Sequence, residues 1–114
     1  MHRIYSMAFS KVYPLYVTKV ERKGRTQAEL DEVLLWLTGF SPDELTAAVA
    51  DDITFTELFD VARLHPNAEL ITGTICGVKI QEIEEPLMKK IRYMDKLVDE
   101  LAKGRPMAKI LRVA

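Results

Sequence analysis

The 114-residue sequence contains one cysteine, two histidines and no long apolar run. Because Cys76 has no second cysteine to pair with, the chain forms no internal disulfide, which is typical of proteins in a reducing compartment. The longest uninterrupted apolar run covers residues 33–37, far short of the roughly 20 residues that cross a bilayer. Polar residues interrupt the first 11 positions, where a signal peptide needs a continuous apolar stretch. The single cysteine, the short apolar runs and the polar residues near the N-terminus together predict a cytoplasmic protein without a membrane segment.

The sequence also lacks the groupings of residues that most catalytic and metal sites need. No cysteine or histidine pair has metal-ligand spacing, and no glycine is followed by the Lys-Ser/Thr pair of a phosphate-binding loop. Cys76 could act as a nucleophile only if a base approached it, and the sequence offers just His2 and His65. We therefore predict no metal and no cofactor, and we expect Cys76 to be buried. A small enzyme centred on Cys76 is the weakest of the functional hypotheses.

Length and composition indicate one globular domain covering residues 1–114. The chain is 48% hydrophobic and 29% charged, which is ordinary for a folded domain. A chain of this size buries roughly two-thirds of its unfolded surface and can build its own core, although a core shared with a second copy also fits.

Helix start and stop signals are concentrated between residues 23 and 45. Thr26 and Glu29 have the spacing of a capping box, and Gly39 is a typical helix terminator. Between them, apolar residues recur every three or four positions, which places them on one stripe of a helix: Leu30, Val33, Leu34 and Leu37. A second helix start follows at once, with Ser41 as its cap and Pro42 as its first residue. This segment predicts two consecutive helices.

Similar signals predict the other elements. Apolar residues from Phe9 to Val20 keep the spacing of a first helix up to Gly24, and Pro14 is tolerable if it lies in the first turn. A capping box at Thr54 opens a fourth helix after a short third one. Pro86 opens a long fifth helix whose apolar residues follow a bundle or coiled-coil spacing: Leu87, Ile91, Met94, Val98 and Leu101. Residues 70–80 are rich in glycine and β-branched residues, which disfavour helix. The fold class is therefore mainly α: a small bundle of five to six helices, with either a short β-hairpin or an irregular connector at residues 70–80.

Charge is distributed unevenly along the chain. The net charge is −1, but residues 1–25 carry +5, residues 26–78 carry −9 and residues 79–114 carry +3. These blocks can neutralise one another across the fold. Alternatively, the basic ends bind an anionic partner or the acidic middle of a second copy. The second interpretation predicts a homodimer, which the apolar stripe of the fifth helix also favours.

The sequence offers one candidate anion site, formed by Lys23, Arg25 and Thr26. These residues stand beside the free N–H groups and the positive dipole end of the helix that follows Thr26. A second Lys-Gly-Arg occurs at residues 103–105. A lysine followed by glycine is also a routine helix stop signal, so helix termination is an alternative explanation for both Lys-Gly-Arg segments.

Recognition of a DNA groove by residues 35–45 is disfavoured. This segment loosely matches a helix-turn-helix, but its second helix carries only acidic charges, which repel the phosphate backbone. A pocket that includes Cys76, Arg92 and Tyr93 is a further hypothesis, since Arg92 and Tyr93 lie beside the apolar stripe of the fifth helix. Packing between helices explains those two positions equally well.

Several short motifs occur together and in order over nearly the whole chain: Val12-Tyr13-Pro14, Lys23-Gly24-Arg25-Thr26, Trp36-Leu37-Thr38-Gly39, Cys76-Gly77-Val78, Pro86-Leu87-Met88, Ile91-Arg92-Tyr93 and Asp99-Glu100-Leu101-Ala102-Lys103-Gly104. As a set they resemble the prokaryotic "domain of unknown function 2200" family. The resemblance implies a small bacterial or archaeal protein without an established activity, so it transfers no catalytic residues. The function expected from the sequence is that of a cytoplasmic binding or assembly module, with an anion or nucleic-acid binder using the basic ends as the alternative.

Overall fold

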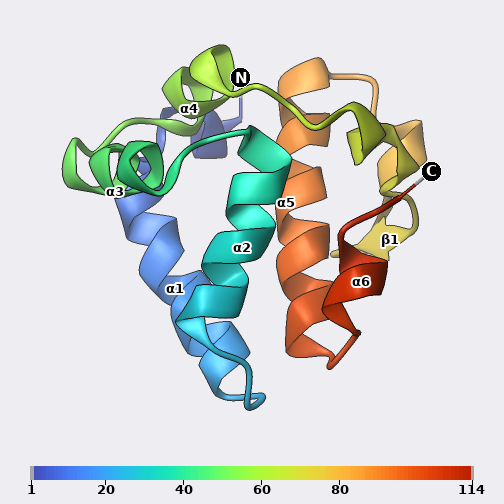
Figure 1. Ribbon diagram of the computed structural model, residues 1–114. Coiled ribbons are helices and arrows are strands. Elements are labelled where there is room, and N and C mark those ends of the chain that lie inside the picture. The colour runs from blue at the N-terminus through green and yellow to red at the C-terminus, as the bar shows by residue number, and fades with distance from the viewer. Residues whose placement is uncertain (1, 114) are drawn as a thin grey trace.

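The computed structural model describes residues 2–113 and has the expected mainly α fold (Figure 1). Its helices are α1 (Phe9–Glu21), α2 (Gln27–Thr38), α3 (Pro42–Ala50), α4 (Phe55–Val61), α5 (Pro86–Ala102) and α6 (Met107–Ile110). Three 3-10 helices, η1 (Arg3–Ser6), η2 (Pro66–Leu70) and η3 (Ile80–Glu82), and the strands β1 (Thr74–Ile75) and β2 (Val78–Lys79) complete this part of the chain. None of the helices within residues 2–113 has both the length and the apolar character needed to cross a membrane.

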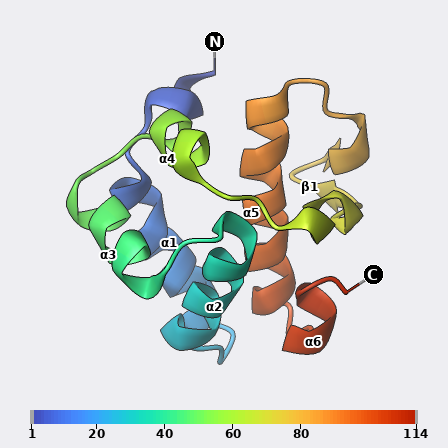
Figure 2. The same ribbon diagram turned by 45° about the horizontal axis from the view of Figure 1, so that its top comes forward.

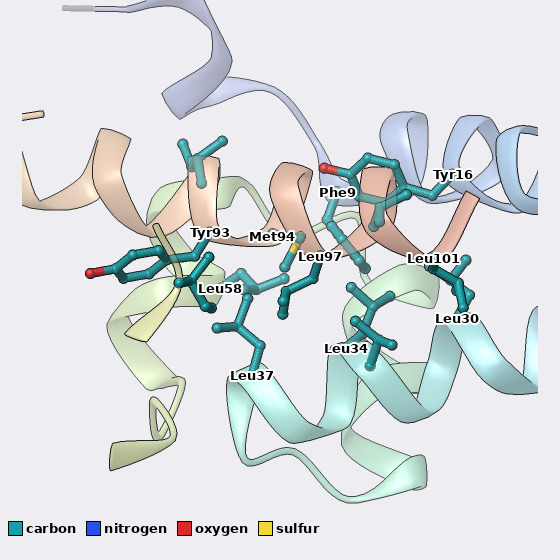
Figure 3. Close-up of a cluster of buried hydrophobic side chains, with 14 of the residues drawn as sticks. Phe9, Tyr16, Leu30, Leu34, Leu37, Leu58, Tyr93, Met94, Leu97 and Leu101 are labelled. Carbon is teal, nitrogen blue, oxygen red and sulfur yellow. The ribbon is translucent and has the colours of Figure 1, made fainter. Parts of the chain in front are cut away.

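Helix α5 lies at the centre of the molecule. It contacts α1, α2 and α4 on one side, and β1, η3 and α6 on the other (Figures 1 and 2). From Ile91 to Leu101 its predicted apolar stripe is buried among leucine side chains of α2 and α4, as Figure 3 shows for Met94 and Leu101, whereas Leu87 is half-buried. The stripe is therefore the core of a single chain, and it is not available as a coiled-coil seam between two copies.

The helix ends follow the sequence signals. Capping boxes form at all three predicted places, with Thr26, Ser41 and Thr54 each accepting a hydrogen bond from the backbone N–H three residues later. Gly39 ends α2 in the left-handed conformation, with φ of 71°. The segment that follows α4 passes close to this helix end, where the Arg63 N–H donates to the Thr38 carbonyl at 2.6 Å. Local sequence thus sets where α2, α3 and α4 begin and where α2 ends.

Pro14 does not lie in the first turn of its helix, where the sequence would tolerate it. Helix α1 begins at Phe9, and Pro14 falls in its second turn. The start is fixed by tertiary contacts, since the Phe9 side chain is fully buried and its N–H donates to the Ile53 carbonyl at 2.8 Å. Proline removes one helical hydrogen bond here. The helix nevertheless continues to Glu21.

Residues 70–80 contain the short hairpin that the sequence allowed. Thr74 pairs with Lys79 and Ile75 with Val78, which leaves Cys76 and Gly77 as a two-residue turn with φ of 52° and 77°. Two successive positive φ angles are the pattern of a type I′ hairpin turn. The expectation that Cys76 is buried is wrong: it is exposed, because the turn projects from the sheet into solvent.

The C-terminal segment is held by ionic contacts. Glu100 on α5 is buried, and its carboxylate accepts from Arg112 at 2.8 Å and from Arg105 at 3.0 Å. Arg25 reaches the same end of the molecule, donating to the Arg105 carbonyl at 2.9 Å. The α1–α2 turn and the α5–α6 turn are thereby joined at one end of the fold.

Candidate functional site

A groove of about 530 Å³ lies between η2, η3 and the first half of α5. We call it the Tyr93 groove. Its apolar surface comes mainly from Leu64, Ala68, Ile71 and Pro86, and its polar groups include Glu69, Gln81, Lys89, Lys90 and Tyr93. Grooves of this size with an apolar floor and a few polar groups are the usual form of small-molecule sites.

Local sequence explains how the two walls of this groove form. Pro66 opens η2, where the His65 Nδ1 accepts from the Asn67 N–H at 3.0 Å. The His65 ring stacks on Trp36 of α2 with 4.2 Å between ring centroids. Pro86 opens α5 on the opposite wall. Spacings of three and four residues then place Lys89, Lys90 and Tyr93 near one another on that helix.

Tyr93 differs from the other three tyrosines. Tyr5, Tyr13 and Tyr16 each donate the hydroxyl to a carboxylate at 2.5 Å: Glu85, Asp31 and Asp95 respectively. Within residues 2–113, no group hydrogen-bonds the Tyr93 hydroxyl, although the residue is only 6% exposed and lines the groove. Figure 3 shows its oxygen at the outer end of the ring, pointing away from the leucine cluster. A buried ring thus presents an unpartnered donor to the groove.

The charges of the groove are also unpaired. Lys89 and Lys90 are half-buried, and Glu69 is exposed. None of the three takes part in an ion pair within the described chain. Burial and, after it, the negative charge of Glu69 raise the pKa of Tyr93 above its usual value. The Tyr93 hydroxyl is therefore a protonated donor at neutral pH.

The predicted anion site at Lys23, Arg25 and Thr26 has a different geometry. The Arg25 guanidinium donates to Glu29 at 2.8 Å through Nη2 and at 3.1 Å through Nε, while its Nη1 donates to backbone carbonyls. The Thr26 hydroxyl accepts from the Glu29 N–H. Lys23 is exposed in the adjoining turn. The three residues are neighbours, but the contacts of two of them lie within the protein.

The hypothetical pocket of Cys76, Arg92 and Tyr93 is divided in the structure. Arg92 donates to Asp95 at 3.2 Å, beside the hydroxyl of Tyr16. The pKa of Tyr16 lies well above its usual value. Burial is the largest cause, the charge of Asp95 and its hydrogen bond come next, and Cys76 has the smallest effect in this direction. Tyr93 lines the groove on the η2 side, and neither Arg92 nor Cys76 is among the residues that line it.

No base contacts the exposed thiol of Cys76 within residues 2–113. His65 stacks on Trp36, and His2 packs against Tyr5 and Glu85. Over the same residues, no group of three or more histidine, cysteine or carboxylate side chains could hold a metal ion.

The other polar residues of the Tyr93 groove were missed by sequence reasoning. The spacing of Lys89 and Lys90 ahead of Tyr93 on one helix was a usable signal, because it places two cations beside an aromatic donor. Glu69 and Gln81 carried no such signal, since they reach the groove through the path of the connector between α4 and α5.

Comparisons with other proteins agree with this fold. A family described as "Uncharacterized protein conserved in bacteria (DUF2200)" matches residues 3–112. The crystal structure of the uncharacterized protein SP1917 superposes with a TM-score of 0.90 at 42% sequence identity, covering 97% of this chain and 93% of that one. No curated protein matches the chain.

Proposed function

Since the chain belongs to the DUF2200 family of uncharacterised bacterial proteins, we propose its function from its own side chains: it is a binding module whose Tyr93 groove takes a small organic anion. The observation that carries the proposal is the buried Tyr93, whose hydroxyl opens to the groove without a partner. Among the described residues no side-chain N or O atom is both buried and unpartnered, so the Tyr93 hydroxyl is open to the solvent of the groove. A ligand acceptor would take the place of water at this donor.

The lysines give the charge of the ligand. Lys89 and Lys90 are half-buried and unpaired within the described chain, so an anion beside them would gain two charge-assisted contacts. Glu69 acts in the opposite sense, because its charge influences Tyr93 directly. We therefore place the anionic group of the ligand at the lysines and an uncharged acceptor, such as a carbonyl, at Tyr93.

Two further groups have donors available for such a ligand. The side-chain oxygen of Gln81 accepts from the Gly73 N–H at 3.1 Å, which leaves its amide N–H groups for another partner. The His65 Nδ1 is occupied as an acceptor, so the neutral ring carries its proton on Nε2. Together with the apolar floor, these donors suit a carboxylate or phosphate on a small organic body.

The test is an NMR titration of the protein with a panel of carboxylates and phosphate monoesters at low and high salt. We expect saturable shifts at residues around the groove, with binding that weakens as salt rises. The double change Lys89→Gln and Lys90→Gln should weaken binding at least tenfold, and Tyr93→Phe about fivefold, corresponding to ~1 kcal/mol for one neutral hydrogen bond.

Lys109→Gln is the control, because it removes one positive charge from an exposed residue of α6 that lies outside the groove. Its affinity should stay within twofold of the unsubstituted protein. Equal affinity in all four proteins would refute the proposal.

Binding of an anion or nucleic acid by the basic ends, through Lys23, Arg25 and Thr26, is the alternative proposal. The exposed Lys23 supports it, and the internal contacts of Arg25 weigh against it. In a parallel titration with single-stranded RNA, shifts confined to the α1–α2 turn and lost in Lys23→Ala would favour this alternative. Catalysis centred on Cys76 has less support, because the described chain supplies its thiol with no base.

We also propose that residues 1–114 form one cytoplasmic domain that assembles as a homodimer. One continuous hydrophobic core supports the single domain, and the lone cysteine supports the reducing compartment.

The distribution of charge supports the dimer. Among the ion pairs of residues 2–113, only the pair of Arg25 and Glu29 joins a basic end of the chain to its acidic middle. Most of the opposed charge is thus free to face a second copy. A monomer by light scattering at micromolar concentration would exclude the dimer.

A further inference from the structure

A second groove, of about 390 Å³, lies on a different part of the molecule, where α3 packs against α1 and α2 (Figures 1 and 2). Its walls are largely aliphatic, with Leu35 from α2 and Leu45 and Val49 from α3. Asp31 is the one lining residue that is charged at neutral pH, among the residues the structure describes. An apolar groove with a single carboxylate has the opposite character to the Tyr93 groove.

The carboxylate is held in position by a chain of hydrogen bonds. The Tyr13 hydroxyl donates to Asp31 Oδ1 at 2.5 Å, and the same hydroxyl accepts from the Gln27 side-chain amide at 2.8 Å. Burial, with the hydrogen bond to Asp31 next, raises the pKa of Tyr13 to about 12, so the hydroxyl remains a donor. Asp31 Oδ1 is thereby engaged, whereas Oδ2 accepts no hydrogen bond within residues 2–113.

No cation neutralises Asp31. It is half-buried, and it forms no ion pair in the described part of the chain. Arg25, the basic residue nearest to it in sequence, is already paired with Glu29 at 2.8 Å. A half-buried carboxylate with one free oxygen and no counter-charge can accept a charge-assisted hydrogen bond from a cation.

We propose that this groove binds a small aliphatic amine, with the ammonium group on Asp31 and the hydrocarbon chain along Leu35, Leu45 and Val49. Charge complementarity supports this occupant, since the ammonium donates to the free Asp31 Oδ2 and the net charge of residues 26–78 is −9. The aliphatic walls match an alkyl chain, whose burial contributes ~0.8 kcal/mol for each methylene. An organic anion is excluded from the same place by repulsion from Asp31.

The experiment compares three probes of equal chain length at neutral pH: n-hexylammonium, n-hexanol and hexanoate. We expect n-hexylammonium to produce saturable NMR shifts in α2 and α3, to bind at least tenfold more tightly than n-hexanol, and to displace no ligand from the Tyr93 groove. Asp31→Asn should weaken n-hexylammonium at least tenfold. It keeps the side-chain oxygen that accepts from Tyr13, so the fold is preserved, which far-UV circular dichroism verifies.

Glu32→Gln is the matched control, because it removes the next charge along α2 from an exposed residue that does not line the groove. Its affinity for n-hexylammonium should stay within twofold. Equal binding of n-hexanol and n-hexylammonium, unchanged affinity in Asp31→Asn, or no shifts at millimolar n-hexylammonium would each overturn the proposal. Tighter binding of a lysine-containing tripeptide than of n-hexylammonium would overturn the assignment to a free amine, in favour of a protein partner.

Discussion

At the scale of single residues, the tyrosines show how one residue type serves two purposes. Three of them fasten neighbouring elements by donating to carboxylates, for example Tyr16 on α1 to Asp95 on α5. Tyr93 makes no such bond within residues 2–113 and lines a groove instead. The sequence does not distinguish these cases, because the partner carboxylates of Tyr5 and Tyr16 lie 80 and 79 residues away. Only the folded chain separates the fastening tyrosines from the candidate ligand contact.

Gly39 provides a residue-scale prediction about stability. A Cβ at this position would lie 2.5 Å from the Arg63 carbonyl oxygen, in a backbone with φ of 71°. We expect Gly39→Ala to lower the free energy of unfolding by about 2 to 4 kcal/mol, combining left-handed strain with a backbone clash. Urea denaturation measures this change.

Gly24 supplies the matched control for that measurement. It also has a positive φ, of 80°, but a Cβ there would meet no atom within 4 Å. Gly24→Ala should therefore cost only about 1 to 2 kcal/mol, from strain alone. Equal losses in the two variants would show that the approach of Arg63 to Gly39 contributes nothing.

At the scale of elements, helix boundaries were predictable and tertiary placements were not. Thr26, Ser41 and Thr54 cap their helices as their spacing from a glutamate requires, because capping depends on residues three apart. The register of α1 depends instead on contacts of Phe9 with residues 53 and 55, which a local pattern does not contain. Cys76 shows the same contrast between local pattern and folded structure. Its apolar neighbours suggested burial, but it lies in a type I′ turn and is exposed to solvent.

The candidate site was predictable only in part, for the same reason. Tyr93 was named from its position beside the apolar stripe, and it does line a groove. Cys76 and Arg92 are not among the residues that line this groove, and their association with Tyr93 stays a prediction. Glu69 and Gln81 come from irregular connectors, whose course is decided by packing rather than by periodicity.

The cap of α4 gives an element-scale prediction. This helix spans seven residues, so its end contributes a large share of its stability. Thr54→Ala removes the side-chain acceptor of the Glu57 N–H and should lower the free energy of unfolding by about 1 kcal/mol.

Hydrogen exchange locates that effect. Amide protection should fall mainly in α4, while global unfolding is followed by urea denaturation. Thr18→Ala is the control, because Thr18 is exposed within α1 and its hydroxyl only returns to the Pro14 carbonyl. It should be neutral or slightly stabilising. A loss in Thr18→Ala as large as in Thr54→Ala would contradict the role of the cap.

At the scale of the whole molecule, the tyrosine hydroxyls make the free energy of unfolding depend on pH in the alkaline range. Burial and the hydrogen bond to Asp31 raise the pKa of Tyr13 to about 12, and the pKa of Tyr16 lies well above its usual value chiefly because of burial. The folded chain therefore retains protons that the unfolded chain releases from about pH 10. Stability is full below that pH and falls as the pH rises toward and beyond 12.

Urea unfolding at several pH values between about 9 and 12 measures this loss, with phenolate absorbance reporting ionisation. Tyr13→Phe should have a shallower fall, because one linked proton is removed. A free energy of unfolding that stays constant across this range in the unsubstituted protein would show that the tyrosines titrate alike in both states.

The contacts of Glu100 also limit the order in which this protein can accumulate substitutions. Its carboxylate faces Arg112, Arg105 and Lys96, with N–O distances of 2.5 Å, 3.0 Å and 3.9 Å. A lineage that loses Arg112 first still has two cations beside the acid, whereas one that loses Glu100 first leaves three cations facing one another. The path through an intact acid is the easier one, so we expect substitutions of Arg112 or Arg105 to be tolerated before any loss of Glu100.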